Sequence, residues 1–222
     1  MKKVTAFIPI KLNNERTPGK NTRTFSDGTP LCHFIQRTLL QVPEIDDIVV
    51  FCSEEKIQDY ILLGVRYMPR PSSLDSSSTL YTDLIRGFIE SCPSDIYVMT
   101  HATSPFVRPE RFSECIQAVL SGEHDSAFIG KRVMDYLWKD GEPLNFCRDH
   151  IPRTQDLECI YRETSGAYVF TKEVFERYRG RIGRNPHICA CGEIESIDID
   201  WPEDFMIAEA VYEHIIKKQQ KA

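Results

Sequence analysis

Short apolar runs alternate with segments of helical spacing along most of this chain, and that alternation constrains its fold more than any other feature. Runs rich in Val, Ile and Phe predict strands over residues 4–10, 48–52, 65–68, 96–100, 126–130, 166–170 and 194–199. Helical spacing predicts helices over 31–39, 54–63, 80–91, 109–120 and 171–178, and a closing helix that carries Phe205, Ala208, Val211, Tyr212 and Ile215. Repeated strand–helix units favour an α/β fold with a mainly parallel, twisted sheet flanked by helices.

The composition is typical of a soluble globular protein. We expect the 222 residues to form one domain with a sizeable core, because 41% of them are hydrophobic and 27% are charged. The net charge of −6 argues against a nucleic-acid partner. The apolar run at the start is too short for the hydrophobic region of a signal peptide, and no apolar run is as long as a membrane span. With eight scattered cysteines, these features predict reduced thiols, a cytoplasmic location and no membrane partner.

A polar, basic loop follows the first predicted strand. It carries three cations and three side-chain amides: Lys11, Arg16, Lys20, Asn13, Asn14 and Asn21. In α/β proteins the carboxyl end of a strand opens into a crevice, where loop amides and cations meet phosphate groups. The loop therefore predicts a nucleotide site. The alternative is a solvated loop whose turn is set by Pro18 and Gly19.

Two carboxylates, Asp198 and Asp200, stand two residues apart at the end of the last predicted strand. That spacing places both on one face, where like charges repel unless a cation lies between them. Oxygen ligands of this kind suit Mg²⁺. The alternative is that Asp200 caps the helix beginning near Pro202, with Glu203 completing a capping box. The two roles are compatible.

Two further segments break the regular pattern. Residues 131–164 are polar, contain prolines and show no clear period, which predicts a functional extension or an interface arm rather than a plain connection. His187, Cys189 and Cys191 are spaced more tightly than ordinary zinc ligands, and no fourth ligand is evident. We therefore interpret the two cysteines as buried thiols near the last strand.

Five motifs, in order along residues 4–209, resemble those of the acylneuraminate cytidylyltransferases, also called CMP-sialic acid synthetases. They are Ile8-Pro9-Ile10-Lys11 with Pro18-Gly19-Lys20-Asn21, Arg70-Pro71, Ala102-Thr103-Ser104-Pro105, Pro152-Arg153-x-Gln155 with Gly166-Ala167-Tyr168, and Asp198-Ile199-Asp200-Trp201-Pro202-Glu203-Asp204. The resemblance implies a Rossmann-like nucleotidyltransferase fold that transfers CMP from CTP to the anomeric hydroxyl of a nonulosonic acid. It also implies a homodimer in which part of residues 131–164 crosses to the second subunit.

The resemblance implies a division of labour among residues. Lys20 and Asn21 would hold the phosphates and ribose of CTP, Arg70 would lie near the cytosine, and Asp198 and Asp200 would hold Mg²⁺ at the α-phosphate. The acceptor would be bound by His101, Lys139, Arg153, Gln155 and Tyr168, with Arg153 pairing with its carboxylate.

The chemistry also follows from the residue types. The acceptor hydroxyl attacks the α-phosphorus in line, so positioning and charge neutralisation dominate. Lys11, Arg16 and Lys20 would neutralise the leaving pyrophosphate, and Asn13 would contribute to the nucleotide site. Lys11, Lys20 and Asp200 are therefore the predicted catalytic residues.

This sequence departs from the family pattern at four positions. Lys11 replaces an arginine, Glu15 a lysine, His101 a glutamine and Ser165 an asparagine. Two alternatives follow: a related sugar nucleotidyltransferase with another acceptor or nucleotide, and a catalytically degenerate nucleotide-binding module of the same fold.

Overall fold

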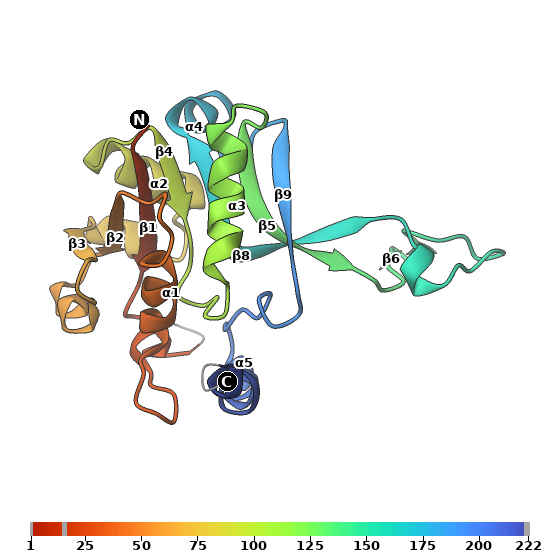
Figure 1. Cartoon of the computed structure of the whole chain (residues 1–222), viewed down its shortest axis with the longest axis horizontal. Coiled ribbons are helices and arrows are strands. Elements are labelled where there is room, and N and C mark those ends of the chain that lie inside the picture. Colours follow the sequence, from red (N-terminus) through yellow and green to blue (C-terminus); the bar gives the residue numbers. More distant parts are fainter. Residues whose placement is uncertain (1, 15–16, 220–222) are drawn as a thin grey trace.

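A computed structural model describes residues 2–14 and 17–219, and its centre is a seven-stranded sheet in the order β3-β2-β1-β4-β8-β5-β9 (Figure 1). The strands are β1 (Val4–Ile10), β2 (Asp47–Cys52), β3 (Arg66–Pro69), β4 (Ile96–Met99), β5 (Ser126–Val133), β8 (Ile160–Thr171) and β9 (Pro186–Cys191). All run parallel except β8, which is antiparallel to β4 and β5. The predicted mainly parallel α/β fold is thus confirmed. Because the parallel strands share a direction, their carboxyl ends meet at one edge of the sheet.

Helices cover both faces of this sheet. The helices α1 (Leu31–Leu39) and α3 (Pro109–Leu120) pack on one face, and α2 (Tyr81–Ser91) and α4 (Lys172–Tyr178) pack on the other. The side chains of β1 alternate accordingly, with Ile8 facing the α1 and α3 side and Phe7 stacking on Phe88 of α2. Both faces are apolar, so β1 is buried along almost its whole length.

The predicted last strand, 194–199, is wrong. The last strand is β9, which contains His187, Cys189 and Cys191. Residues 192–197 fold into a turn, in which Ser196 N–H donates to the Gly192 carbonyl. The apolar residues that suggested a strand, Ile194, Ile197 and Ile199, instead contribute to a small core beneath the C-terminal helix. Within the described residues, which include every cysteine, all eight are free thiols, as predicted.

Residues 54–63 also differ from the prediction, since this segment contains a 3₁₀ helix, η2 (Glu55–Tyr60), and no α-helix. Two further 3₁₀ turns, η1 (Lys20–Thr22) and η3 (Ser72–Asp75), shape loops at the carboxyl edge of the sheet. A third, η4 (Thr154–Asp156), lies between β7 and β8.

Strands β5 and β8 are longer than predicted and leave the sheet together as a ribbon. Figure 1 shows this ribbon continuing into a projecting arm. The arm carries a two-stranded hairpin, β6 (Trp138–Lys139) and β7 (Glu142–Pro143), turned by Asp140 and Gly141 with φ of 52° and 83°. An Asp-Gly pair with positive φ at both positions suits a tight hairpin. The long polar segment, residues 131–164, is therefore an extension with its own regular structure.

The C-terminal region is helical. It comprises α5 (Pro202–Val211), a π-helical turn η5 (Tyr212–Ile216) and α6 (Lys217–Gln219). Phe205 and Tyr212 pack with Phe25 and Phe34 in the small core mentioned above. This packing fixes α5 beside the carboxyl edge. In the described part of the chain, every helix is too short or too polar to cross a bilayer.

Candidate active site

Lys20 connects the first loop to the segment that contains Asp198 and Asp200. The residue is buried, with 7% of its surface exposed, and its ammonium group donates to the Ile199 carbonyl at 2.8 Å and to Asp200 Oδ1 at 3.0 Å. Thr17 Oγ1 donates to the Asp200 carbonyl at 3.0 Å. Gly19, with φ of 67°, lets the loop turn into η1 and present Lys20. Two segments 180 residues apart are thereby locked together.

Asp198 has a carboxylate oxygen that lacks a protein partner. Its Oδ2 accepts a hydrogen bond from Ser165 Oγ at 2.9 Å, whereas its Oδ1 is buried without a hydrogen bond among the described residues. Ile199 between the two aspartates is fully buried, whereas Asp198 and Asp200 are half-buried. A buried, unpaired carboxylate oxygen carries a desolvation cost that a bound cation relieves. These residues therefore fit a magnesium ion.

The helix cap comes from a third aspartate. Asp204 accepts hydrogen bonds from the N–H groups of Asp200 and Trp201, at 2.9 and 2.8 Å. This is the backward half of a capping box at the start of α5. The capping role that was open for Asp200 thus belongs to the Asp204 side chain. The Asp200 carboxylate pairs with Lys20 instead.

A pocket of about 200 Å³ opens at the carboxyl ends of β1, β3 and β4. It is smaller than the ~300–1,000 Å³ typical of whole-ligand sites, so it fits one part of a larger ligand. Its lining brings together three predicted site residues, Lys11, Arg70 and His101. The helix α2 contributes Tyr81 to the same wall.

Arg70 is buried and held in place by an ion pair with Asp75. Asp75 also accepts a hydrogen bond from Ser53, which follows β2. The Arg70 Nε is buried without a hydrogen bond in the described structure. The ion pair with Asp75 therefore fixes the guanidinium of Arg70 in the pocket wall.

His101 lies after β4, with its ring edge-on to Tyr81 at 5.7 Å between centroids. Burial, together with the nearby cations Arg181 and Lys20, lowers the pKa of this imidazole to about 3. His101 is consequently neutral at physiological pH, with one ring nitrogen able to donate and the other to accept.

Tyr168 is buried and its hydroxyl is already occupied. The oxygen lies 2.7 Å from both Glu163 Oε1 and the Thr164 carbonyl, and burial raises the pKa of this phenol. The guanidinium of Arg181 stacks on its ring at 3.5 Å and also pairs with Glu163. Arg181 was missed in the sequence because its partners come from separate elements.

The remaining predicted residues do not line this pocket. Lys139, Arg153 and Gln155 lie on the arm, where Arg153 pairs with Asp156 at 2.7 Å and its side chain is 74% exposed. Asn13 is exposed in the first loop.

Two other residues of the first loop complete the comparison with the prediction. Asn21 is buried and donates to the Lys11 carbonyl at 2.9 Å, which braces the loop. Arg16 lies outside the described residues.

Two larger cavities lie elsewhere in the molecule. One, of about 680 Å³, is bounded by α1, the start of α3, residues 192–195 and the C-terminal helices. The other, of about 630 Å³, lies between α2 and α4. Among the predicted site residues that the structure describes, none lines either cavity, so we place the candidate site at the carboxyl edge of the sheet.

Comparison with known proteins identifies the family of this chain. The family model for cytidylyltransferases matches residues 5–221. The chain belongs to the cytidylyltransferase family. The relatives in that comparison include N-acylneuraminate cytidylyltransferase A of Danio rerio, 24% identical over 90% of this chain and 49% of the relative. Another is CMP-N,N'-diacetyllegionaminic acid synthase of Legionella pneumophila, 27% identical over 95% of this chain and 97% of the relative.

The chain spans about half the length of the fish N-acylneuraminate cytidylyltransferases that it matches. Among solved structures, CMP:2-keto-3-deoxy-manno-octonic acid synthetase complexed with CTP gives a TM-score of 0.72 at 17% identity. That match covers 95% of this chain and 98% of the other. The 4-diphosphocytidyl-2C-methyl-D-erythritol synthase from Anaerococcus prevotii gives 0.66 at 16% identity and covers 96% and 97%. These likenesses establish the nucleotidyltransferase fold.

Proposed function

We propose that this protein transfers CMP from CTP to the anomeric hydroxyl of a nonulosonic, sialic-acid-like sugar acid and releases pyrophosphate. The observation that carries the proposal is the junction of Lys20 with the Asp198–Asp200 segment beside a pocket lined by Lys11, Arg70 and His101. Two lysines suited to phosphate, a carboxylate suited to a cation and a recess for part of a ligand thus lie together at the carboxyl edge of the sheet. The named activities of the two curated relatives support the same reaction.

Each residue has a role in the proposed reaction. Lys11 and Lys20 bind phosphate oxygens and offset the charge that builds on the leaving pyrophosphate. Asp198 and Asp200 would hold Mg²⁺, which typically takes one or two carboxylates together with substrate phosphates. The ion, when bound, polarises the α-phosphate. Arg70 and the neutral His101 line the recess and orient the substrate through hydrogen bonds.

The acceptor side of the proposal requires a second subunit. Lys139, Arg153 and Gln155 lie on an arm that projects from the β5 and β9 side of the sheet (Figure 1), whereas the pocket lies at the ends of β1, β3 and β4. They reach an acceptor only if the arm extends over the site of another copy. The arm also exposes large apolar side chains that a partner would cover: Met134, Tyr136, Trp138, Leu144 and Ile151. We therefore propose a homodimer with isologous arm contacts.

Pyrophosphate release from CTP tests the function. The assay uses Mg²⁺, a panel of eight- and nine-carbon sugar acids, and ATP, GTP and UTP as alternative nucleotides. We expect release only with CTP and a sugar acid. Release with a sugar alcohol or a sugar phosphate alone would favour a related transferase with another acceptor. CTP binding without release on any acceptor would favour a degenerate binding module.

A further inference from the structure

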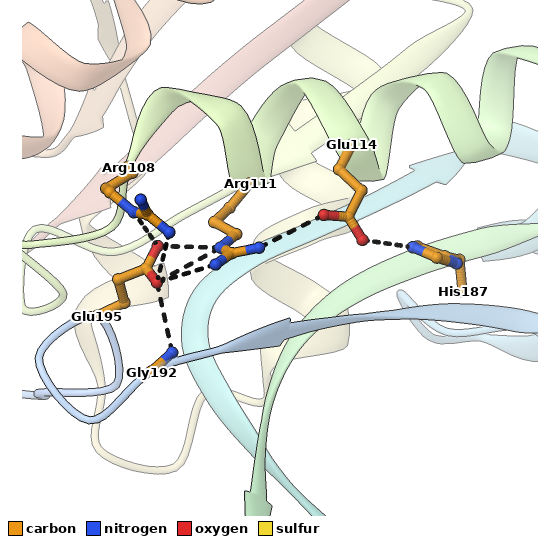
Figure 2. Close-up of polar contacts among 6 residues, drawn as sticks. All are labelled: Arg108, Arg111, Glu114, His187, Gly192 and Glu195. Carbon is orange, nitrogen blue, oxygen red and sulfur yellow. Dashed lines mark hydrogen bonds and ion pairs between the residues drawn. The ribbon is translucent and has the colours of Figure 1, made fainter.

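Glu195 is a buried carboxylate in the turn between β9 and the acidic pair. Its side chain is only 8% exposed. It accepts hydrogen bonds from Arg111 Nε at 3.1 Å, from Arg108 Nη2 at 3.3 Å and from the Gly192 N–H at 3.3 Å. Figure 2 shows the carboxylate lying between the two guanidinium groups. Burial alone would raise the pKa of Glu195, but the two arginines hold it below its ordinary value. The carboxylate is therefore charged at neutral pH.

Both arginines belong to the start of α3, directly after a turn of the candidate site. Arg108 is the N-cap residue of α3, and Arg111 lies in its first turn. The preceding turn contains Thr103, whose carbonyl accepts the N–H of Ile199 at 2.9 Å. Glu195 thus ties the segment before Asp198 to the same part of the molecule that Ile199 contacts after it.

Within the described residues, the segment from 192 to 200 takes part in no strand pairing. Its first part is held by turn hydrogen bonds, by a 3.4 Å contact from Arg162 to the Ser196 carbonyl and by the Glu195 pairs. Its last part is held by Lys20 and Thr17. Asp198 lies between these two anchors. A charged anchor three residues upstream is well placed to set where the Asp198 carboxylate points.

We propose that Glu195 is a positioning residue: clamped by Arg108 and Arg111, it fixes the segment that presents Asp198 and Asp200 to a divalent cation. The catalytic meaning of this clamp rests on the proposed function, but the clamp itself does not. Residues that orient metal ligands from behind typically change metal affinity 10- to 100-fold when mutated. The competing explanation is an ion pair that only stabilises the fold.

Glu195→Gln separates the two explanations, because it removes the charge and keeps the shape. Asp47→Asn is the matched control. It breaks the Arg66–Asp47 pair, whose Nη2–Oδ2 distance is 2.8 Å, between β2 and β3 at the far side of the sheet from β9. If Glu195→Gln folds poorly, Arg108→Gln replaces it, since Arg108 is 58% exposed and Arg111 remains on Glu195.

The first measurement needs no metal. Amide hydrogen exchange over residues 192–200 should be about tenfold faster in Glu195→Gln than in wild type and unchanged in Asp47→Asn. Equal exchange in wild type and Glu195→Gln would overturn the proposal, whatever the activity of the protein.

The second measurement uses Trp201, which adjoins Asp200. In a Trp138→Phe background it is the sole tryptophan of the chain. Mn²⁺, a paramagnetic quencher, is titrated in the presence of CTP. We expect the half-quenching concentration to rise at least tenfold in Glu195→Gln and to stay unchanged in Asp47→Asn. Faster exchange with an unchanged Mn²⁺ response would show that the clamp holds the turn without positioning the aspartates, and would refute the proposal. A wild type that Mn²⁺ does not quench would refute the proposed metal site instead.

Discussion

Asp200 contacts Lys20 of the first loop through its carboxylate and Asp204 of α5 through its N–H. Its substitution separates a catalytic role from a structural one. Asp200→Asn keeps an oxygen that can accept from Lys20, so we expect the fold to survive with a loss of about 1 kcal/mol. Turnover of CTP should fall by on the order of 100-fold or more, because the carboxylate charge is lost. Steady-state kinetics in Mg²⁺ checks this. Glu203→Gln, an exposed neighbour in α5, is the control and should remain active.

His101 gives a prediction about acid. Its pKa is about 3 in the folded protein, against an ordinary value of 6.5. The unfolded chain therefore takes up a proton that the folded chain refuses, so the stability contribution is full above pH 6.5 and declines as the pH falls toward 3. Between pH 7 and pH 5 we expect wild type to lose up to about 2 kcal/mol more unfolding free energy than His101→Gln. Urea denaturation at both pH values measures this, and parallel losses in the two proteins would contradict it.

At the scale of elements, the ion pairs of Glu195 with Arg108 and Arg111 give a second prediction about how folding stability depends on pH. The pKa of Glu195 is lowered from 4.5, so its ion pairs stabilise the fold above pH 4.5 and are lost as the pH falls through the folded value. Glu195→Gln should cost about 2 kcal/mol at pH 7, as expected for a hydrogen-bonded charge. That cost should shrink below pH 4.5. Thermal or urea unfolding of both proteins across this range is the check, and a cost independent of pH would argue against a charged Glu195.

Elements also show how far the sequence reaches. Helix 109–120 and strand 4–10 were predicted with their observed bounds, because the strand is one short apolar run and the helix has helical spacing with Pro109 at its first turn. Strand 194–199 was predicted wrongly because a short segment with three isoleucines has the same pattern whether they face a sheet or a separate small core.

The site residues were likewise only partly predictable from the sequence. Lys20 and the aspartates were found from motifs. Arg181 and Glu195 were not, since their roles arise from contacts among β8, α2, α3 and residues 192–195 that no local pattern encodes.

At the scale of the whole molecule, the arm makes the proposed dimer testable by mixing two inactive proteins. Asp200→Asn disables the site of its own chain, and Arg153→Ala disables the arm. If the arm acts across the dimer, a hybrid has one site with an intact Asp200 and an arm with an intact Arg153. Random mixing then restores about a quarter of wild-type activity, since half of the dimers are hybrids with one working site of two.

The outcome of the mixing is decisive for the arm. No restoration after unfolding and refolding the mixture would mean that Arg153 acts within its own chain or not at all. Light scattering provides the control, because both variants should be dimers at micromolar concentration.

The arm leaves the sheet from two strands that are still paired, with Val133 opposite Ile160 at the last rung. Neighbouring strands lie ~4.8 Å apart, so the two points of attachment are close enough for a two-residue turn to join them. We therefore expect that the segment between residues 133 and 160 can be shortened, lengthened or exchanged without changing the strand order or the sheet edge that carries Lys20. Under the proposed function, changes confined to this segment would alter the acceptor and leave the proposed phosphate-binding residues in place.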